Sequence, residues 1–403
     1  MRHLPLLSVL LLLLPGCSLQ KRIDKVSANI AEQYADVHTW ETLPVRTISW
    51  NQAVAMMKKN NIDYIRTQKT IERAERSELS VYTDLIPGMT YYSYFTRAIG
   101  KLSSAVNSDD LTQNLNVTFY LPSLTQVPYQ VYSTKATTFA AIKSLEGKER
   151  ELISQLYTQQ RKQEITARKN KLDNEHNQSE PALALKKTNT EATEWMELAT
   201  LLGDYSARWR ILPASVPKFK WSHYSKCTGK LDELVVCKLA LELEQARMEQ
   251  YSIALNYLPT INLNLYSPSL FSSTGGTYSG TFLDKDDTKL NVSLNYTFDT
   301  RLRTWNRFCD SKEAYELKQR ETTARLIELK HNLKALRNSM EEYYAWRGYM
   351  TKQIEHLSSA PAANAAEFLE NEKQIHSMKA ELINQELAAV ESEAALILQY
   401  GMR

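Results

Sequence analysis

Apolar and polar residues alternate without exception over the first ten residues of the stretch Leu290–Thr300, which reads "LNVSLNYTFDT". A period of two is typical of a β-strand with one apolar and one polar face. About sixty residues without a proline follow, and they are typical of a single long helix. The sequence therefore predicts a short two-faced strand directly before a very long helix. The apolar positions of this strand are Leu290, Val292, Leu294, Tyr296 and Phe298.

The first half of the chain predicts the same order of elements. A helix begins at Ser49, with Gln52 three residues later as the partner in a capping box, and it continues to about Asp84. Pro87 then ends the helical pattern, and two alternating stretches precede a proline-free helical run over residues 129–180. The two stretches are Met89–Phe95 and Leu115–Leu121.

The second half repeats this order, so we interpret the chain as an internal duplication. A helix over residues 231–257 breaks at Pro259, which corresponds to Pro87. The "LNVS" that begins at Leu290 corresponds to the "LNVT" that begins at Leu115. The unit is helix, strand, strand and long helical hairpin, which gives four strands for each chain.

Apolar residues also recur every seven positions in the second long helix, which predicts helices packed side by side along their length. The hairpin turns at Ser358–Ala366 and its second helix runs to Leu398, whereas the first hairpin turns near Asp173–Pro181 and is about twenty residues shorter. Only Arg347 interrupts the heptad pattern. The members of the heptad pattern are Leu329, Leu336, Tyr343, Met350 and Leu357, with Leu326, Leu333, Met340 and Ile354 at the companion position.

The N-terminus predicts export. "MRHLPLLSVLLLLLPGC" has a basic start, an apolar run shorter than the roughly 20 residues of a membrane-spanning helix, and turn residues before Cys17. We interpret residues 1–16 as a signal peptide. "LPGC" resembles a bacterial lipobox, which predicts a lipid on Cys17, and Ser18 favours the outer membrane. The alternative is an ordinary signal peptide that happens to precede a cysteine.

Composition excludes several classes of function. The 49 basic and 46 acidic residues nearly balance, without the concentrated basic face that nucleic-acid binding needs. We find no nucleophile elbow, phosphate-binding glycine loop or metal-ligand spacing, so we expect no enzyme activity, no metal and no cofactor beyond the lipid on Cys17. In an oxidising periplasm Cys227 and Cys237 could form a disulfide and leave Cys309 over. Two unpaired thiols are the alternative.

Four strands of seven to ten residues are close to the roughly 9–11 residues that cross a bilayer at a tilt. A membrane does not tolerate an open sheet edge, and the smallest bacterial barrels have about eight strands. One copy cannot close a barrel, whereas three copies together supply twelve strands. The alternative is a small soluble sheet that caps a lipid-anchored periplasmic coiled-coil scaffold without a pore.

The sequence resembles the TolC-type outer membrane factors, in particular their lipid-anchored branch. The similar segments, in order along nearly all of the mature chain, include the opening helix and both helix-to-strand joins. They also include the strand that ends in a Phe-Asp turn and the returning last helix. They read "ISWNQAVAMMKKNNIDYI", "LIPGMTYYSY", "YLPTINLNLYSP", "LNVSLNYTFDTRLR" and "EFLENEKQIHSMKAELINQELAAVESEAALILQYG".

This resemblance implies a mainly α fold with a small β part. Long helical hairpins would form a trimeric α-barrel, and four strands from each chain would form a shared twelve-stranded β-barrel in the outer membrane. The protein would be a passive exit duct of a tripartite efflux system, linked to an inner-membrane transporter by a periplasmic adaptor. Type I protein secretion is a variant that these residues do not separate from drug or metal efflux.

The resemblance also implies a gate at the periplasmic end. Ala366–Glu370 matches the segment that carries the family's acidic rings, which places Glu367 and Glu370 in the gate. The alternative is that both are ordinary solvated residues in the first turn of a helix, where acidic side chains are favourable. Two departures are the short segment 207–230, which implies a reduced equatorial belt, and a first hairpin tip without the family's usual glycine, which puts adaptor docking there in doubt.

We expect five segments: a signal peptide, an anchored N-terminal segment, a first repeat, an inter-repeat equatorial linker and a second repeat. Their ranges are 1–16, 17–48, 49–205, 206–229 and 230–403.

Overall fold

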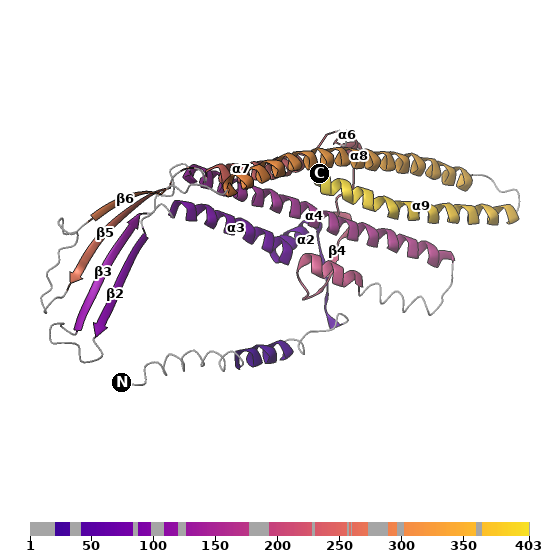
Figure 1. The fold of residues 1–403 in the computed structure, drawn as a ribbon. Helices are drawn as coiled ribbons and strands as arrows, with labels where there is room; N and C mark the ends of the chain where they lie inside the picture. The colour runs from indigo at the N-terminus through magenta and orange to yellow at the C-terminus, as the bar shows by residue number, and fades with distance from the viewer. Residues whose placement is uncertain are drawn as a thin grey trace.

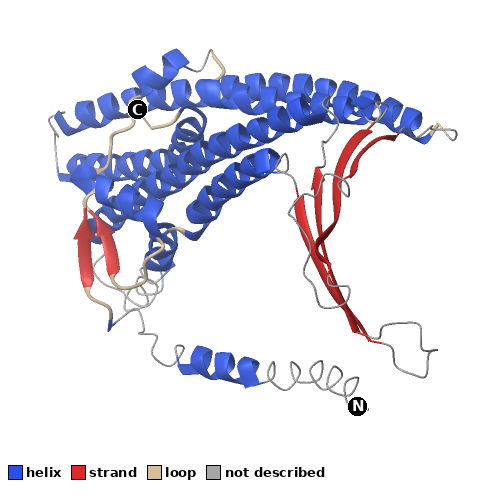
Figure 2. Ribbon diagram, turned by 90° about the vertical axis from the view of Figure 1, so that its left-hand side faces the viewer, coloured by secondary structure: helices blue, strands red, loops and turns tan. Residues whose placement is uncertain are grey.

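A computed structural model of the chain describes most of the predicted elements (Figures 1 and 2). The described residues are 21–32, 42–83, 88–97, 109–119, 126–176, 193–227, 230–255, 258, 260–272, 289–295, 302–359 and 365–402. Cys17 and the signal peptide lie outside these ranges.

The long helices run alongside one another, and a sheet lies at one end of them (Figure 1). Helix α4 packs on α3, α7 and α9, and α8 packs on α7 and α9. Shorter helices cover residues 21–32 and 193–202. The helices are α2 (Trp50–Asn60), α3 (Ile62–Thr83), α4 (Gln126–His176), α6 (Trp221–Cys227), α7 (Glu233–Leu255), α8 (Arg303–Ser359) and α9 (Ala365–Tyr400).

The four predicted strands form one antiparallel sheet in the order β2-β3-β5-β6. Val117 pairs with Met89 on one side and with Leu265 on the other, and Leu265 pairs with Leu290. Because alternate residues share a face, this register puts the apolar positions of all four strands on the same face of the sheet. The strands are β2 (Gly88–Arg97), β3 (Asp109–Phe119), β5 (Thr260–Ser272) and β6 (Lys289–Asn295).

A second, two-stranded sheet was not predicted. Strand β1 (Val45–Ile48) pairs in parallel with β4 (Arg208–Ile211), and so joins the N-terminal segment to the segment between the repeats. A short 3-10 turn, η2 (Pro213–Ser215), follows β4, and Ser215 Oγ accepts a hydrogen bond of 2.9 Å from the backbone N–H of Trp50. The main hydrophobic core lies beside this sheet and includes Trp50, Met57, Tyr157, Leu198, Trp209 and Leu396.

The predicted capping box at the start of α2 is confirmed. The backbone N–H of Gln52 donates to Ser49 Oγ, and Gln52 Oε1 accepts from the backbone N–H of Ser49 at 2.8 Å. The two side chains thereby satisfy N–H groups that have no partner inside the helix.

The single helix predicted from Ser49 to Asp84 is wrong in one respect, because it divides at Asn61 into α2 and α3. The Asn61 Oδ1 accepts from the backbone N–H groups of Asp63 and Tyr64, at 3.0 Å each, and so begins a second helix. Its Nδ2 donates to the carbonyl of Leu201 at 3.0 Å. The break is therefore fixed by a contact with a segment 140 residues away.

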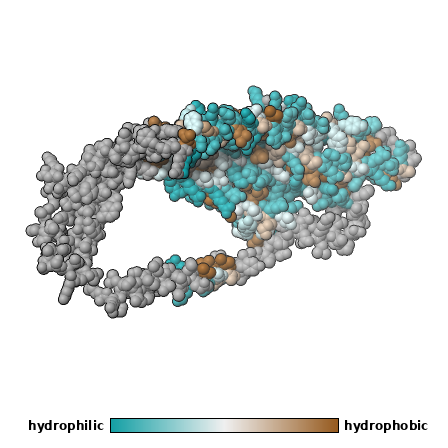
Figure 3. Space-filling view, in the orientation of Figure 1, coloured by the Kyte–Doolittle hydropathy of each residue, from teal (hydrophilic) through white to brown (hydrophobic). Residues whose placement is uncertain are grey.

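The heptad pattern of α8 is confirmed. Leu333 and Met340 are buried, the other seven apolar members are half-buried, and Arg347, which interrupts the pattern, is exposed. The members face α7 and α9, on which α8 packs. On the face shown in Figure 3, the described helices carry mostly hydrophilic residues with hydrophobic ones scattered between them.

The first hairpin is shorter than the second, as predicted. It extends from Gln126 to the end of the helix over 193–202, and the second extends from Arg303 to Tyr400, which is about twenty residues longer. Among the described residues, none of the helices has both the length and the hydropathy that crossing a membrane requires.

Gly203 follows the helix over residues 193–202 and packs against the backbone of Asn60, and a substitution can test this contact. It has a φ of 66°, and an added Cβ would lie 2.4 Å from the carbonyl oxygen of Asn60. Gly203→Ala should therefore lower the free energy of unfolding by at least ~1 kcal/mol, because both the positive φ and the backbone contact oppose a side chain. The measurement is the thermal unfolding midpoint followed by circular dichroism.

Gly348→Ala is the matched control, because nothing lies within 4 Å of the added Cβ in α8. Alanine in a helix interior is favoured over glycine by roughly 0.5–1 kcal/mol, so this variant should be slightly more stable than the wild type. Equal midpoints for the two variants would contradict the packing of Gly203 against Asn60.

Candidate functional site: the hairpin tip and the buried charge cluster

The two predicted gate residues lie at the start of α9. Glu367 is in its first turn and Glu370 follows one turn later, and both are exposed. The Nε2 of Gln374 donates to Glu370 Oε1 at 3.4 Å. Carboxylates near a helix N-terminus are stabilised by the helix dipole. The position is compatible with the predicted gate and equally with the solvated alternative, so the gate stays a prediction.

The tip of the second hairpin extends beyond the end of α4. The His376 Nε2 lies 3.3 Å from the carbonyl oxygen of Leu172, so these two residues are level with each other. Beyond that level α9 continues to Ala365, whereas α4 ends at His176. At about 1.5 Å per residue, α9 projects about 10 Å further than α4. Glu367 and Glu370 therefore lie on a part of α9 that α4 does not reach.

A cluster of charged side chains holds α4 against α9 further from the tip. Glu386 Oε1 accepts hydrogen bonds from Arg161 Nη2 at 2.9 Å and from Arg168 Nη2 at 2.8 Å. Two turns away, Tyr157 Oη donates to Glu393 Oε2 at 2.6 Å. Glu386 and Glu393 are only 4% and 5% exposed. This charge cluster therefore lies inside the interface between the two helices.

Burial and charge affect the two glutamates in opposite ways. Burial raises the pKa of Glu393 above its ordinary value, and the hydrogen bond from Tyr157 and the charge of Arg161 compensate only in part. Burial also acts to raise the pKa of Glu386, but the hydrogen bond and charge of Arg168 and the charges of Arg161 and Arg347 outweigh it, so this pKa is lowered. The cluster is therefore one strongly paired carboxylate beside one that burial disfavours.

Helix α8 adds a rim of aromatic and basic side chains to the charge cluster. Burial raises the pKa of Tyr344 to about 12, assisted by the charge of Glu393. Burial raises the pKa of Tyr343 as well, assisted by the charge of Glu386. Both phenols therefore stay protonated at neutral pH, and the ionised groups near Glu393 are Glu386, Arg161 and Arg347.

Sequence reasoning missed the charge cluster, because carboxylates along a helix were assigned to a solvated face. The signal was nevertheless present in the spacing. Glu386 and Glu393 alternate with apolar residues at intervals of three and four, which is the spacing of a helix core. The apolar members of this row are Ile383, Val390 and Ile397.

The structure does not contain the predicted disulfide. Cys227, Cys237 and Cys309 are free thiols, each half-buried. Cys227 Sγ lies 3.9 Å from His223 Nε2 at the end of α6, whereas Cys237 lies in α7, which packs on α4 and α8. The two thiols therefore have different neighbours. Within the described residues, no group of three or more His, Cys, Asp or Glu side chains has the arrangement of a metal site.

Replacing Glu386 by Gln should destabilise the protein at neutral pH. Arg161 and Arg168 would lose the carboxylate between them, at a cost of about 2 kcal/mol. Because the pKa of Glu386 is lowered, its contribution is full above its ordinary value of 4.5 and is lost as the pH falls through the lowered pKa. The difference in unfolding midpoint between wild type and Glu386→Gln should therefore be constant above pH 4.5 and shrink below it.

Replacing Glu393 by Gln should instead stabilise the protein at neutral pH. The amide oxygen still accepts from Tyr157, but the cost of a buried charge is removed, so the variant should unfold at a higher temperature than wild type at pH 7. The advantage should shrink as the pH falls toward 4.5, because wild-type Glu393, with its raised pKa, then takes up a proton. Glu391→Gln, an exposed control with a side chain 74% accessible, should match the wild type. A lower midpoint for Glu393→Gln at pH 7 would refute this account.

The structure is similar to solved structures of outer membrane channels. No protein-family model matches the sequence, and no curated protein matches it. The Campylobacter jejuni CmeC outer membrane channel is 14% identical, with a TM-score of 0.55 over 87% of this chain and 85% of that one. The outer membrane protein VceC from Vibrio cholerae is 12% identical, with a TM-score of 0.56 over 87% and 95%. The Neisseria gonorrhoeae MtrE outer membrane channel, in its open state, is 13% identical, with a TM-score of 0.53 over 87% and 89%.

At these identities the likeness concerns the fold, and it extends over most of every chain compared. The chain has the fold of the TolC-type outer membrane factors.

Proposed function

We propose that this protein is the outer membrane duct of a tripartite efflux or type I secretion system, and that it works as a lipid-anchored homotrimer. It carries out no reaction. An inner-membrane transporter supplies the energy and selects the cargo, and a periplasmic adaptor connects the two. The similarity in fold to bacterial outer membrane channels supports this role.

The observation that carries the proposal is the four-stranded sheet. In the described chain β2 and β6 form its two outer edges, and each is paired on one side only. The aligned apolar positions form one face of the sheet, and polar positions form the other. A lipid-facing sheet cannot keep open edges, because their backbone groups find no water to bond. Pairing β2 of one copy with β6 of the next closes a barrel, and three copies give twelve strands.

The helices give the duct its length on the periplasmic side. Helix α8 has 57 residues, so at about 1.5 Å per residue it extends roughly 85 Å from the sheet. Three copies of the hairpins would form a tube of this length. In this proposal residues 49–205 and 230–403 are the two repeats of its wall, and residues 17–48 and 206–229 form a reduced belt around it.

Glu367 and Glu370 would form the gate at the periplasmic end. Three copies bring six carboxylates around one opening, which favours cations and makes the closed state self-repelling. Within the described residues α9 projects beyond α4, so these carboxylates of the second hairpin would form the ring.

The test is conductance in planar bilayers of detergent-purified protein, with the mass of the assembly measured in parallel. We expect a trimer that conducts in steps and prefers cations. Glu367→Gln/Glu370→Gln should lose most of that preference while the conducting trimer persists, because the ring then carries no charge. Glu75→Gln, which changes an exposed carboxylate of α3, is the control and should keep the preference.

Two results would count against the proposal. A trimer that never conducts, even with Glu367 and Glu370 neutralised, would favour the periplasmic scaffold without a pore. A conducting trimer whose cation preference survives the double substitution would keep the duct and remove these residues from the gate.

A further inference from the structure

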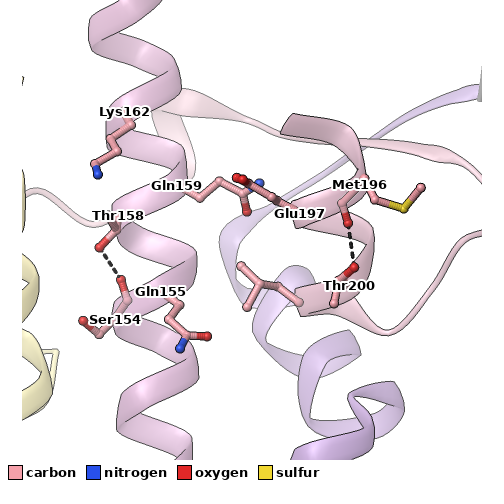
Figure 4. A pocket seen from close by; sticks show the side chains of 9 residues that line it. Ser154, Gln155, Thr158, Gln159, Lys162, Met196, Glu197 and Thr200 are labelled. Carbon is pink, nitrogen blue, oxygen red and sulfur yellow. Dashed lines mark hydrogen bonds between the residues drawn. The ribbon is translucent and has the colours of Figure 1, made fainter. Parts of the chain in front are cut away.

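One opening among the described residues lies between α4 and the helix over residues 193–202, and its lining carries both charge and an unsatisfied polar atom. It is an open cleft of about 530 Å³. Figure 4 shows Gln155 and Gln159 of α4 extending toward this helix, and Glu197 extending from it toward α4. Lys162, also on α4, is directed away from Glu197 in the same view.

The amide oxygen of Gln159 is a buried acceptor that lacks a partner. Gln159 is only 8% exposed, and its Nε2 donates to the carbonyl of Glu194 at 2.8 Å. Its Oε1 is buried and has no hydrogen-bond partner among the described residues. Exchanging the amide atoms would not help, since it would place Oε1 against the carbonyl of Glu194. A buried acceptor without a partner costs about 1–3 kcal/mol, so a hydrogen-bond donor at this position would be favourable.

The other polar groups of the cleft also direct their donors elsewhere. The hydroxyls of Thr158 and Thr200 donate to backbone carbonyls of their own helices, at 2.8 Å each. The Nε2 of Gln155 donates to Glu151 Oε1 at 3.3 Å. Thr200 Oγ1 also accepts from Tyr205 Oη at 3.2 Å, so the Gln159 oxygen is the buried acceptor of the cleft that has no partner among the described residues.

The charged groups of the cleft also favour a positively charged ligand. Glu197 contributes an exposed carboxylate. Lys162 is the one cation in the described lining, and its Nζ lies 3.1 Å from Glu391 Oε1 of α9, outside the cleft. Met196 and Leu201 add an apolar part to the lining. The cleft thus combines a carboxylate, a buried oxygen acceptor and apolar surface.

We propose that this cleft is a binding site for an amphipathic ammonium cation, with its N–H donors toward Gln159 Oε1 and Glu197 and its alkyl part against Met196 and Leu201. A carboxylate with a neutral oxygen acceptor satisfies an ammonium group, whereas the lysine of the described lining, the group that would attract an anion, is already paired with Glu391. The volume is within the range of roughly 300–1,000 Å³ of small-molecule sites.

The experiment is isothermal titration calorimetry of the purified full-length protein with n-hexylammonium, with protein-free detergent as the blank. We expect saturable binding of n-hexylammonium. Hexyltrimethylammonium, which has the charge but no N–H donor, should bind about tenfold more weakly, because a hydrogen bond to a charged group contributes ~1.5–3 kcal/mol. Hexanoate, with the same chain and the opposite charge, should not bind.

Two substitutions connect the binding to the cleft. Glu197→Gln removes the charge at an exposed position and should weaken n-hexylammonium binding about tenfold, and Gln159→Leu removes the buried acceptor and should weaken it several-fold. Glu75→Gln, in the middle of α3 and outside the lining of the cleft, should bind as the wild type does. If Gln159→Leu fails to fold, Glu197→Gln still decides, because its side chain is exposed.

The proposal is overturned if the three ligands bind equally, or if Glu197→Gln binds as tightly as the wild type. Since binding is measured without a membrane potential or a pore, the result is independent of the proposed duct. A protein that conducts but does not bind n-hexylammonium refutes the cleft alone, and one that binds it but never conducts refutes the duct alone.

Discussion

The pairing of β3 with β5 is the constraint on which the arrangement of the chain depends. β3 belongs to the first repeat and β5 to the second, so their backbone hydrogen bonds turn two separate hairpins into one sheet. Along the chain β3 precedes α4 and β5 follows α7, so these two helices meet the sheet as neighbours. The contact of α4 with α7 connects the repeats a second time within the helical layer. The duplicated sequence thus produces one body with a continuous sheet and a continuous layer of helices.

The interface between α4 and α9 adds a further connection, and it contains buried charged groups beside its apolar residues. A buried carboxylate between two arginines is strongly destabilising to break but not strongly favourable to form. The ion pairs therefore act mainly by selecting one register of α4 against α9. Only that register brings Glu386 to both Arg161 and Arg168. Ser154 Oγ, which donates to the carbonyl of Ala394 at 2.7 Å, fixes the same position nearer the core. Together these contacts set the register of the two hairpins.

The sequence was sufficient for the features that repeat locally. The alternation from Leu290 predicted a strand, the heptads from Leu326 predicted a packed helix face, and Ser49 with Gln52 predicted a helix start. It was insufficient where a distant residue decides. Asn61 ends a helix because its side chain donates a hydrogen bond to the carbonyl of Leu201. Strand β1 forms because it pairs with β4, which is about 160 residues later in the chain. The charge cluster was not predicted because carboxylates along a helix are usually solvated, and only the packing of α4 on α9 buries these two. The cleft at Gln159 required the three-dimensional approach of two helices.

The open edges of the sheet have a consequence for the life of a single chain. Edge strands with unpaired backbone groups are templates on which other chains add, and proteins ordinarily protect them with charges, bulges or covering segments. In the described part of this chain, the register gives β2 and β6 no partner on their outer sides. A newly made monomer is therefore an aggregation hazard until its edges are occupied. Selection on this chain must act on how fast it meets its own copies, as well as on what the finished protein does.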